Sequence, residues 1–234
     1  GGGSGEPSLT ISKIVGPTGS VTFTDPVAGM VETAQAEAGR RGLTNIQFNQ
    51  CPADQLPFAD GSFDAVVGRL SAMFFPDPDA ALREVLRVVR HDGLVSFVVW
   101  SEEEANPFFT TINEVIDRLV DSPPDDPDAP DAFRFADPGK FAGLLKNAGA
   151  NNVTERRLNF QIEEKLAFEE FWRLRTEMSE MLRRKLAGMA SAQIPIIKQA
   201  VAEAAQKYFR NGTMSFPAEA LVVTGKRFSR ESDE

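Results

Sequence analysis

Cysteine and histidine are nearly absent from this sequence of 234 residues. The single cysteine, Cys51, excludes an internal disulfide bond and a metal site built from cysteines. The single histidine, His91, excludes a histidine-rich metal site, and any histidine-dependent catalytic triad would have to use it. We therefore expect no bound metal.

Two further features are missing, an excess of positive charge and a long apolar run. The chain has 25 lysines and arginines against 34 aspartates and glutamates, a net charge of −9, and acidic residues gather in residues 121–131. This balance argues against a nucleic-acid partner, which requires a basic surface. No apolar run approaches the roughly 20 residues of a membrane-spanning helix, and no signal peptide is visible. We therefore expect a cytoplasmic protein.

Glycine, by contrast, is concentrated at the start of the sequence. Gly1, Gly2, Gly3 and Gly5 let the backbone turn sharply and approach a ligand closely. Residues 6–15 then show a helical apolar stripe, with Pro7 at its first position and Gly16-Pro17 at its end. A glycine loop that opens a helix presents free N–H groups and a positive dipole end to an anionic or polar cofactor group.

Three interpretations of this loop compete. A dinucleotide fingerprint, as in a nicotinamide-dependent oxidoreductase, requires a glycine where this chain has Glu6. An expression linker accounts for the composition of residues 1–5 but not for the helix signals that follow. The third interpretation, the loop of a different cofactor, depends on the rest of the chain.

Strands alternate with helices along the first 150 residues. The predicted strands are residues 19–23, 45–50, 63–68 and 94–100. Helix 6–15 precedes the first strand and helix 27–40 follows it. A third helix begins at Asp77-Pro78 and ends in the turn His91-Asp92-Gly93. This order predicts an α/β, Rossmann-like fold with a doubly wound, mostly parallel sheet. A glycine loop of this kind normally follows a buried strand, so we expect the first, central strand to be missing from this sequence.

The second part of the sequence is mainly helical. Its predicted elements are helix 110–120, an acidic solvated loop at 122–131, a helix opened by Asp137-Pro138, strand 152–162, helix 165–190, helix 194–210 and strand 218–226. The helices between residues 165 and 210 predict a helical cap inserted before the last strand. We expect a single domain over residues 1–234, divided into a cofactor-binding core (1–109), substrate and cap elements (110–217), the last strand (218–227) and a tail (228–234).

Asp25 follows the strand predicted at residues 19–23, about 20 residues after the glycine loop. An acidic side chain at the carboxyl end of the second strand of a doubly wound sheet can accept hydrogen bonds from both ribose hydroxyls. It can also act as the N-cap of the helix predicted at residues 27–40. The two roles are compatible.

Several segments, in this order and spacing, resemble the class I S-adenosylmethionine (SAM)-dependent methyltransferases, and most of all the ubiquinone and menaquinone C-methylating group. The resemblance is tight over residues 1–109. The segments that carry it are residues 1–7, Thr24-Asp25-Pro26, residues 53–58 (ADQLPF), 61–67 (GSFDAVV), 74–78 (FFPDP), the helix and turn at 79–93, and Trp100. The sequence departs from the family pattern at His91-Asp92-Gly93, where the family has Pro-Gly-Gly, and at Pro52, where relatives often have an aspartate that contacts adenine.

The resemblance implies SAM as the cofactor and S-adenosylhomocysteine as the product. It implies that Gly1, Gly3 and Gly5 face the methionine part and that Asp25 holds the ribose. Pro26, Met30 and Ala53 would flank the adenine, with Asp54 nearby. Arg69, Leu70 and Ser71 would line the region around the sulfonium, although Arg69 is equally well explained as a solvated side chain.

The same resemblance implies an apolar chamber for a small aromatic or quinone-like acceptor. Its candidate residues are Met73, Phe74, Trp100, Asn106, Phe108 and Trp172. Core packing is the competing interpretation for Phe74 and Trp172, and no residue is a clear general base. The function expected is methyl transfer from SAM. A non-catalytic binding or accessory protein with this fold is the alternative, and a homo-oligomer stays open.

Overall fold

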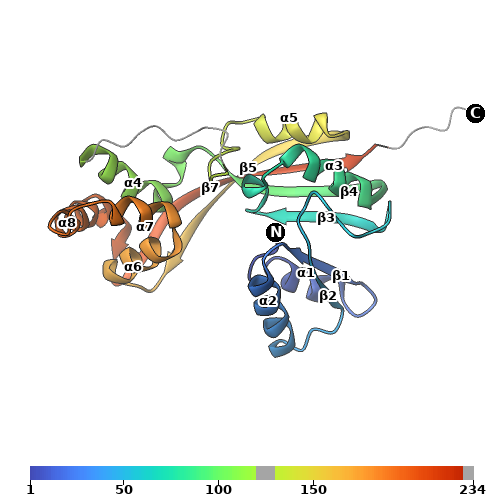
Figure 1. Ribbon diagram of the computed structural model, residues 1–234, viewed down its shortest axis with the longest axis horizontal. Helices are drawn as coiled ribbons and strands as arrows, with labels where there is room; N and C mark the ends of the chain where they lie inside the picture. The colour runs from blue at the N-terminus through green and yellow to red at the C-terminus, as the bar shows by residue number, and fades with distance from the viewer. Residues whose placement is uncertain (120–129, 229–234) are drawn as a thin grey trace, which may run out of the picture. The chain divides into compact units, whose positions relative to one another are not determined.

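The computed structural model describes residues 1–119 and 130–228, which form two compact units (Figure 1). Among the described residues, unit 1 consists of residues 1–100, 130–157 and 220–228, and unit 2 consists of residues 101–119 and 158–219. Most of the predicted acidic loop and of the tail lies outside the described residues. The predicted cap helices belong to unit 2.

The first part of unit 1 is a β-α-β arrangement that follows the glycine loop. Helix α1 (Ser8–Val15), strand β1 (Val21–Asp25), helix α2 (Ala28–Arg40) and strand β2 (Ile46–Gln50) follow one another in the chain. Strand β1 pairs in parallel with β2, and the register brings Asp25 opposite Gln50. Leu9, Phe23 and Ala34 are buried between the strands and the helices. The parallel register places the carboxyl ends of both strands at one edge.

The second part of unit 1 is built on strands β3 (Phe63–Arg69) and β4 (Val89–Trp100), which pair in parallel. Helix α3 (Pro78–Val88) connects them. It begins where the Asp77 side chain accepts the N–H of Ala80, with Pro78 in its first turn, and it buries an apolar face that includes Leu82 and Val85. The short helix η1 (Ala72–Phe74) precedes it.

Two more strands extend this sheet in the order β3-β4-β7-β5, and the short strand β6 (Phe209–Arg210) also pairs with β7. Strand β7 (Thr213–Arg227) runs antiparallel to β4, from Leu94 opposite Lys226 to Trp100 opposite Ala220. Strand β5 (Ala150–Glu164) is the other neighbour of β7 and follows helix α5 (Lys140–Asn147). Unit 1 is thus a mixed α/β structure, as the sequence predicted.

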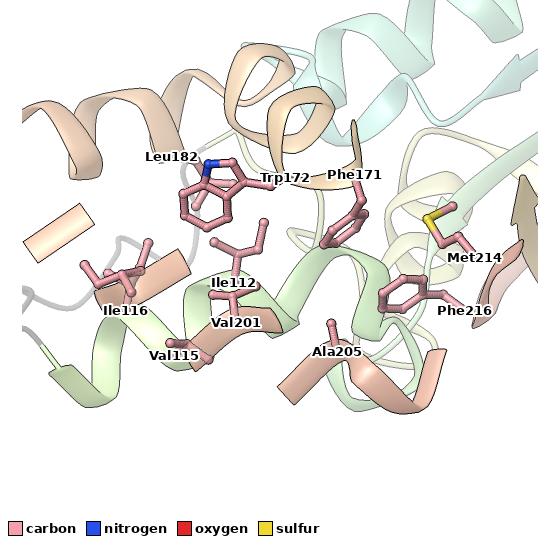
Figure 2. Close-up of a cluster of buried hydrophobic side chains, with 11 residues drawn as sticks. Ile112, Val115, Ile116, Phe171, Trp172, Leu182, Val201, Ala205, Met214 and Phe216 are labelled. Atoms are coloured by element: carbon pink, nitrogen blue, oxygen red, sulfur yellow. The ribbon is translucent and has the colours of Figure 1, made fainter. Parts of the chain in front are cut away.

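Unit 2 is a helical structure around one hydrophobic core (Figure 2). Its elements are η2 (Glu103–Ala105), α4 (Pro107–Leu119), α6 (Phe168–Met178), α7 (Glu180–Ala187), α8 (Gln193–Ala205), η3 (Gln206–Tyr208) and β6 (Phe209–Arg210). Side chains from α4, α6, α7, α8 and β7 meet in the core, among them Ile112, Phe171 and Phe216. The rings of Phe171 and Phe216 stack with centroids 5.2 Å apart.

Two predicted elements were wrong in their extent. The helix predicted over residues 165–190 is divided into α6 and α7 at Ser179. The backbone of Ser179 is extended, and its hydroxyl oxygen caps α7 by accepting the N–H of Leu182. The turn predicted at residues 91–93 lies inside β4 as a bulge, because Phe63 pairs with Val89 while Ala65 already pairs with Leu94. Within residues 1–119 and 130–228, no helix is long and apolar enough to cross a membrane.

Candidate cofactor site

The glycine loop and Asp25 form one hydrogen-bonded structure. The N–H of Gly3 donates to Oδ2 of Asp25 at 2.9 Å, and the N–H of Val27 donates to Oδ1 at 2.9 Å. The loop is also tied to β1 by the N–H of Gly2, which donates to the carbonyl of Thr24 at 2.9 Å. Asp25 is only 5% exposed, so its carboxylate is buried but hydrogen-bonded. The predicted role of Asp25 as N-cap of α2 was wrong, because Val27 occupies that position.

The close packing of the loop explains its glycines. A Cβ atom on Gly2 would lie 2.1 Å from the ring of Phe23, and one on Gly5 would lie 2.5 Å from the Leu9 side chain. Gly3 has a φ of +56° and Gly5 a φ of +123°, which residues with side chains rarely adopt. A flexible linker needs neither feature, so the loop has the properties of a built site.

Glu6, which occupies the place of the last fingerprint glycine, stabilises the start of α1. Its carboxylate accepts the hydroxyl of Thr10 at 2.7 Å and the guanidinium of Arg41 at 2.6 Å. The Thr10 hydroxyl, and then Arg41, lower the pKa of Glu6 against a smaller opposing effect of burial. This position therefore supports the start of the helix.

The carboxyl end of β3 lies next to the same loop. A Cβ atom on Gly1 would lie 2.8 Å from Cβ of Ser71, so the loop and Ser71 are in contact. Leu70 between them has a φ of +54°, and its N–H donates to the carbonyl of Val98 at 2.8 Å. Such a backbone conformation is strained for leucine. The structure thus brings Ser71 to the glycine loop, while the Arg69 side chain is exposed.

A cleft of about 490 Å³ lies between β1 and β3. Within the described residues, β1 pairs only with β2 and β3 only with β4, so both strands turn an unpaired edge to this cleft. Val67 on β3 is 48% exposed, although its strand reads as buried in the sequence. The lining includes four predicted cofactor residues: Gly1, Ala53, Arg69 and Ser71.

The remaining predicted cofactor residues lie around the carboxyl ends of β1 and β2. Pro26 and Met30 are exposed, and Asp54 is half-buried. Cys51 next to them is buried, and burial raises the pKa of its thiol, so the thiol stays protonated at neutral pH. A separate hollow of about 530 Å³ opens at Ser20 and Ile46, the opposite ends of these strands, where ligands of such sheets do not bind.

The predicted acceptor residues fall in both units. In unit 1, Met73 and Trp100 are buried and Phe74 is 52% exposed. In unit 2, Trp172 belongs to the hydrophobic core, and Phe108 packs against it. Asn106 is buried and fully used: its amide donates to the carbonyls of Ser101, Glu102 and Glu219, and it accepts the N–H of Glu219. Its present contacts are structural.

Sequence reasoning missed Arg175 on α6. Its guanidinium lies 4.9 Å from the ring centroids of both Phe108 and Phe109. A signal for it exists, because Phe168, Phe171 and Arg175 are spaced as positions i, i+3 and i+7 of one helix face. An arginine in the apolar stripe of an amphipathic helix departs from the pattern and marks a position to examine.

Residues 1–97 match the family model described as a methyltransferase domain. The chain is 40% identical over 101 residues to an uncharacterised protein of Mycobacterium tuberculosis, in an alignment that covers 43% of this chain and 35% of that protein. It is 36% identical over 108 residues to the ubiquinone/menaquinone biosynthesis C-methyltransferase UbiE of Stenotrophomonas maltophilia, which covers 46% of this chain and 43% of UbiE. The chain thus spans less than half the length of these curated relatives.

The crystal structure of the YcgJ protein from Bacillus subtilis is similar over 98% of this chain and 90% of its own, with a TM-score of 0.61 and 22% identity. At this identity the likeness shows a shared Rossmann-like fold. Residues 1–97 are therefore similar to a methyltransferase domain, in agreement with the motifs of the sequence.

Proposed function

We propose that the protein is a SAM-dependent methyltransferase that acts on a small, largely apolar acceptor, aromatic or quinone-like. The observation that carries this proposal is the 2.9 Å hydrogen bond from Gly3 to Asp25, because it joins the glycine loop to the carboxylate at the end of β1. Both ends of a nucleoside could then be held by one continuous structure. The methyltransferase-domain match of residues 1–97 supports the same function.

The residues present fit SAM on two counts. The glycines let the loop pack closely against Phe23 and Ser71, where a Cβ would clash, so these positions present bare backbone to a ligand. A carboxylate offers about four acceptor positions, and the two backbone N–H groups on Asp25 leave others for ribose hydroxyls. We propose that Pro26, Met30 and Ala53 flank the adenine, with Asp54 nearby. Leu70 and Ser71 would line the region of the sulfonium with Arg69.

Bound SAM supplies a methyl group on a positively charged sulfur that is already a good leaving group. The task of the chain is then mainly alignment of donor and acceptor, and holding two reactants in near-attack geometry is worth about 7–11 kcal/mol. The loop and Asp25 fix the donor end. Because an acidic phenol or an activated carbon needs no strong base, the proposal assigns no general base.

For the acceptor, the candidates proposed from the sequence differ in what they can offer. The exposed ring of Phe74 and the half-buried ring of Phe108 have surface available for an apolar ligand. Met73, Trp100 and Trp172 are buried and offer little surface to a ligand. Asn106 is held by its own loop, so we assign it a supporting role.

Calorimetric titration with S-adenosylhomocysteine tests the proposal. We expect saturable 1:1 binding, and a folded chain that binds none would overturn it. A transfer assay with methyl-labelled SAM and a panel of phenols and quinols then tests turnover.

A non-catalytic protein of the same fold is the second candidate, and the cleft between the unpaired edges of β1 and β3 is the observation that favours it. Such a protein would use this cleft to bind a partner strand and would not bind the cofactor. Size-exclusion chromatography combined with the cofactor titration separates the two candidates.

A further inference from the structure

Arg175 is held against the rim of the hydrophobic core of unit 2. Its guanidinium carbon lies 4.9 Å from the ring centroid of Phe108 and 4.9 Å from that of Phe109, both at the start of α4. Phe108 in turn packs edge-on against Phe171 and Phe216, with centroids 5.6 Å apart in each case, and these two rings appear in Figure 2. The two rings on Arg175 therefore connect it directly to the core.

Among the side chains that the structure describes, no anionic group pairs with this cation. Its Nε is buried without a hydrogen-bond acceptor. Burial lowers the pKa of Arg175 to about 10, so the side chain is still charged at neutral pH. Other half-buried arginines are paired: Arg41 contacts Glu37 and Arg87 contacts Glu84. A largely desolvated charge without a partner costs free energy, and a group with such a perturbed pKa is a candidate for a functional site.

Two further polar atoms nearby in the chain are also unsatisfied. The hydroxyl oxygen of Thr110, which is 4% exposed, and Oδ1 of Asn113 are buried without hydrogen-bond partners in the described structure. Both belong to α4, where residues three and four positions apart share a face. Asn113 is three positions from Thr110 and four from Phe109, which contacts Arg175. The start of α4 thus combines aromatic rings with unsatisfied polar groups.

We infer that Arg175 binds a carboxylate group of a small aromatic or apolar acid, which would pack its body on the rings of Phe108 and Phe109. The planar guanidinium matches a carboxylate with two parallel hydrogen bonds. A single cation balances a single negative charge, whereas a phosphate monoester carries nearly two. The identification of this acid as the methyl acceptor rests on the proposed function; the anion site itself does not.

The test uses the full chain and three probes: benzoate, its neutral isostere benzamide, and phenyl phosphate. Binding is measured by ligand-observed NMR titration for the wild type and for Arg175→Met, Arg175→Lys and Arg173→Met. Arg173 is the matched control, because it lies on the same helix, is 66% exposed and faces Glu177 at 3.6 Å. S-adenosylhomocysteine is titrated into every variant.

We expect the wild type to bind benzoate at least tenfold more tightly than benzamide. Arg175→Met should lose this preference, Arg175→Lys should keep part of it, and Arg173→Met should behave as the wild type. Equal binding of benzoate and benzamide, no benzoate binding, or tighter binding of phenyl phosphate would overturn the inference.

The cofactor titration separates this inference from the proposed function. Arg175→Met should bind S-adenosylhomocysteine like the wild type. If the wild type binds S-adenosylhomocysteine but not benzoate, only the proposal of the carboxylate site is refuted. Benzoate binding that depends on Arg175, in a wild type that binds no cofactor, would uphold the site and remove the methyltransferase proposal.

Discussion

Two charged side chains, the buried Asp25 in unit 1 and the half-buried Arg175 in unit 2, have opposite surroundings. Asp25 in unit 1 is buried with each carboxylate oxygen accepting a backbone N–H. Arg175 in unit 2 is surrounded by Phe108 and Phe109 and lacks a carboxylate partner in the described structure. Asp25 therefore supports the fold even without a ligand, whereas Arg175 costs stability until an anion binds. The comparison suggests different roles: Asp25 holds the shape of its site, whereas Arg175 is proposed to gain its partner when an anion binds.

Removal of Asp25 should have the largest effect. Asp25→Ala leaves the N–H groups of Gly3 and Val27 without their acceptor, and the loss should destabilise the protein by about 2–4 kcal/mol. The variant should also lose measurable binding of S-adenosylhomocysteine. Chemical denaturation and calorimetry measure the two effects. Asp54→Ala is the control, and an equal effect there would refute the special role of Asp25.

Gly2→Ala should have the next largest effect on the same loop. Its Cβ would lie 2.1 Å from the Phe23 ring, and such overpacking costs about 1–3 kcal/mol. Gly29→Ala, inside α2 with no atom within 4 Å of the new Cβ, should be neutral or stabilising by up to about 1 kcal/mol. Thermal unfolding compares the pair, and a Gly2→Ala variant as stable as Gly29→Ala would contradict the packed loop.

Arg175→Met should stabilise the protein, in contrast to Asp25→Ala. The variant removes a buried charge and replaces it with a side chain that packs well on aromatic rings, at the loss of two cation–π contacts. We expect a net gain of about 1 kcal/mol, which corresponds to a rise in Tm of about 2–4 °C. A lower Tm than that of Arg173→Met would show that Arg175 is a purely structural residue.

The smallest effect is expected at Glu37. Hydrogen bonds from Arg40, and then from Arg41, lower the pKa of Glu37 to about 2 in the folded state. A lowered pKa stabilises the fold above the unfolded value of 4.5 and loses this contribution as the pH falls from 4.5 towards 2. Glu37→Gln should therefore be slightly less stable than the wild type at pH 7 and equal to it at pH 2. A constant difference in denaturation midpoint across this range would contradict the ion pair.

Much of unit 1 could be predicted from local pattern alone. The period of apolar residues located β1, β2 and β3 to within a few residues, and Gly16-Pro17 marked the end of α1. The glycine loop and Asp25 were found together because a β-α-β unit fixes their spacing. These features depend on residues that are close to one another in the chain, so a single sequence is enough to predict them.

Two of the features that the sequence did not reveal depend on tertiary contacts, and a third depends on a local cap. The chain stays in β4 through the bulge at residues 90–93 because pairing with β3 resumes on the other side of it. The break between α6 and α7 depends on the local cap at Ser179, which competes with a helix pattern that runs through it. The position of Arg175 in an apolar stripe can be read from the sequence, but the lack of a hydrogen-bond acceptor for its Nε is a property of the folded structure.

The most direct test of the central claim is a crystal structure of the full chain with S-adenosylhomocysteine. We predict ribose hydroxyls within hydrogen-bond distance of the Asp25 carboxylate and the amino-acid end of the ligand at the backbone of residues 1–5. A ligand bound elsewhere, with Asp25 still engaged only by Gly3 and Val27, would contradict the account.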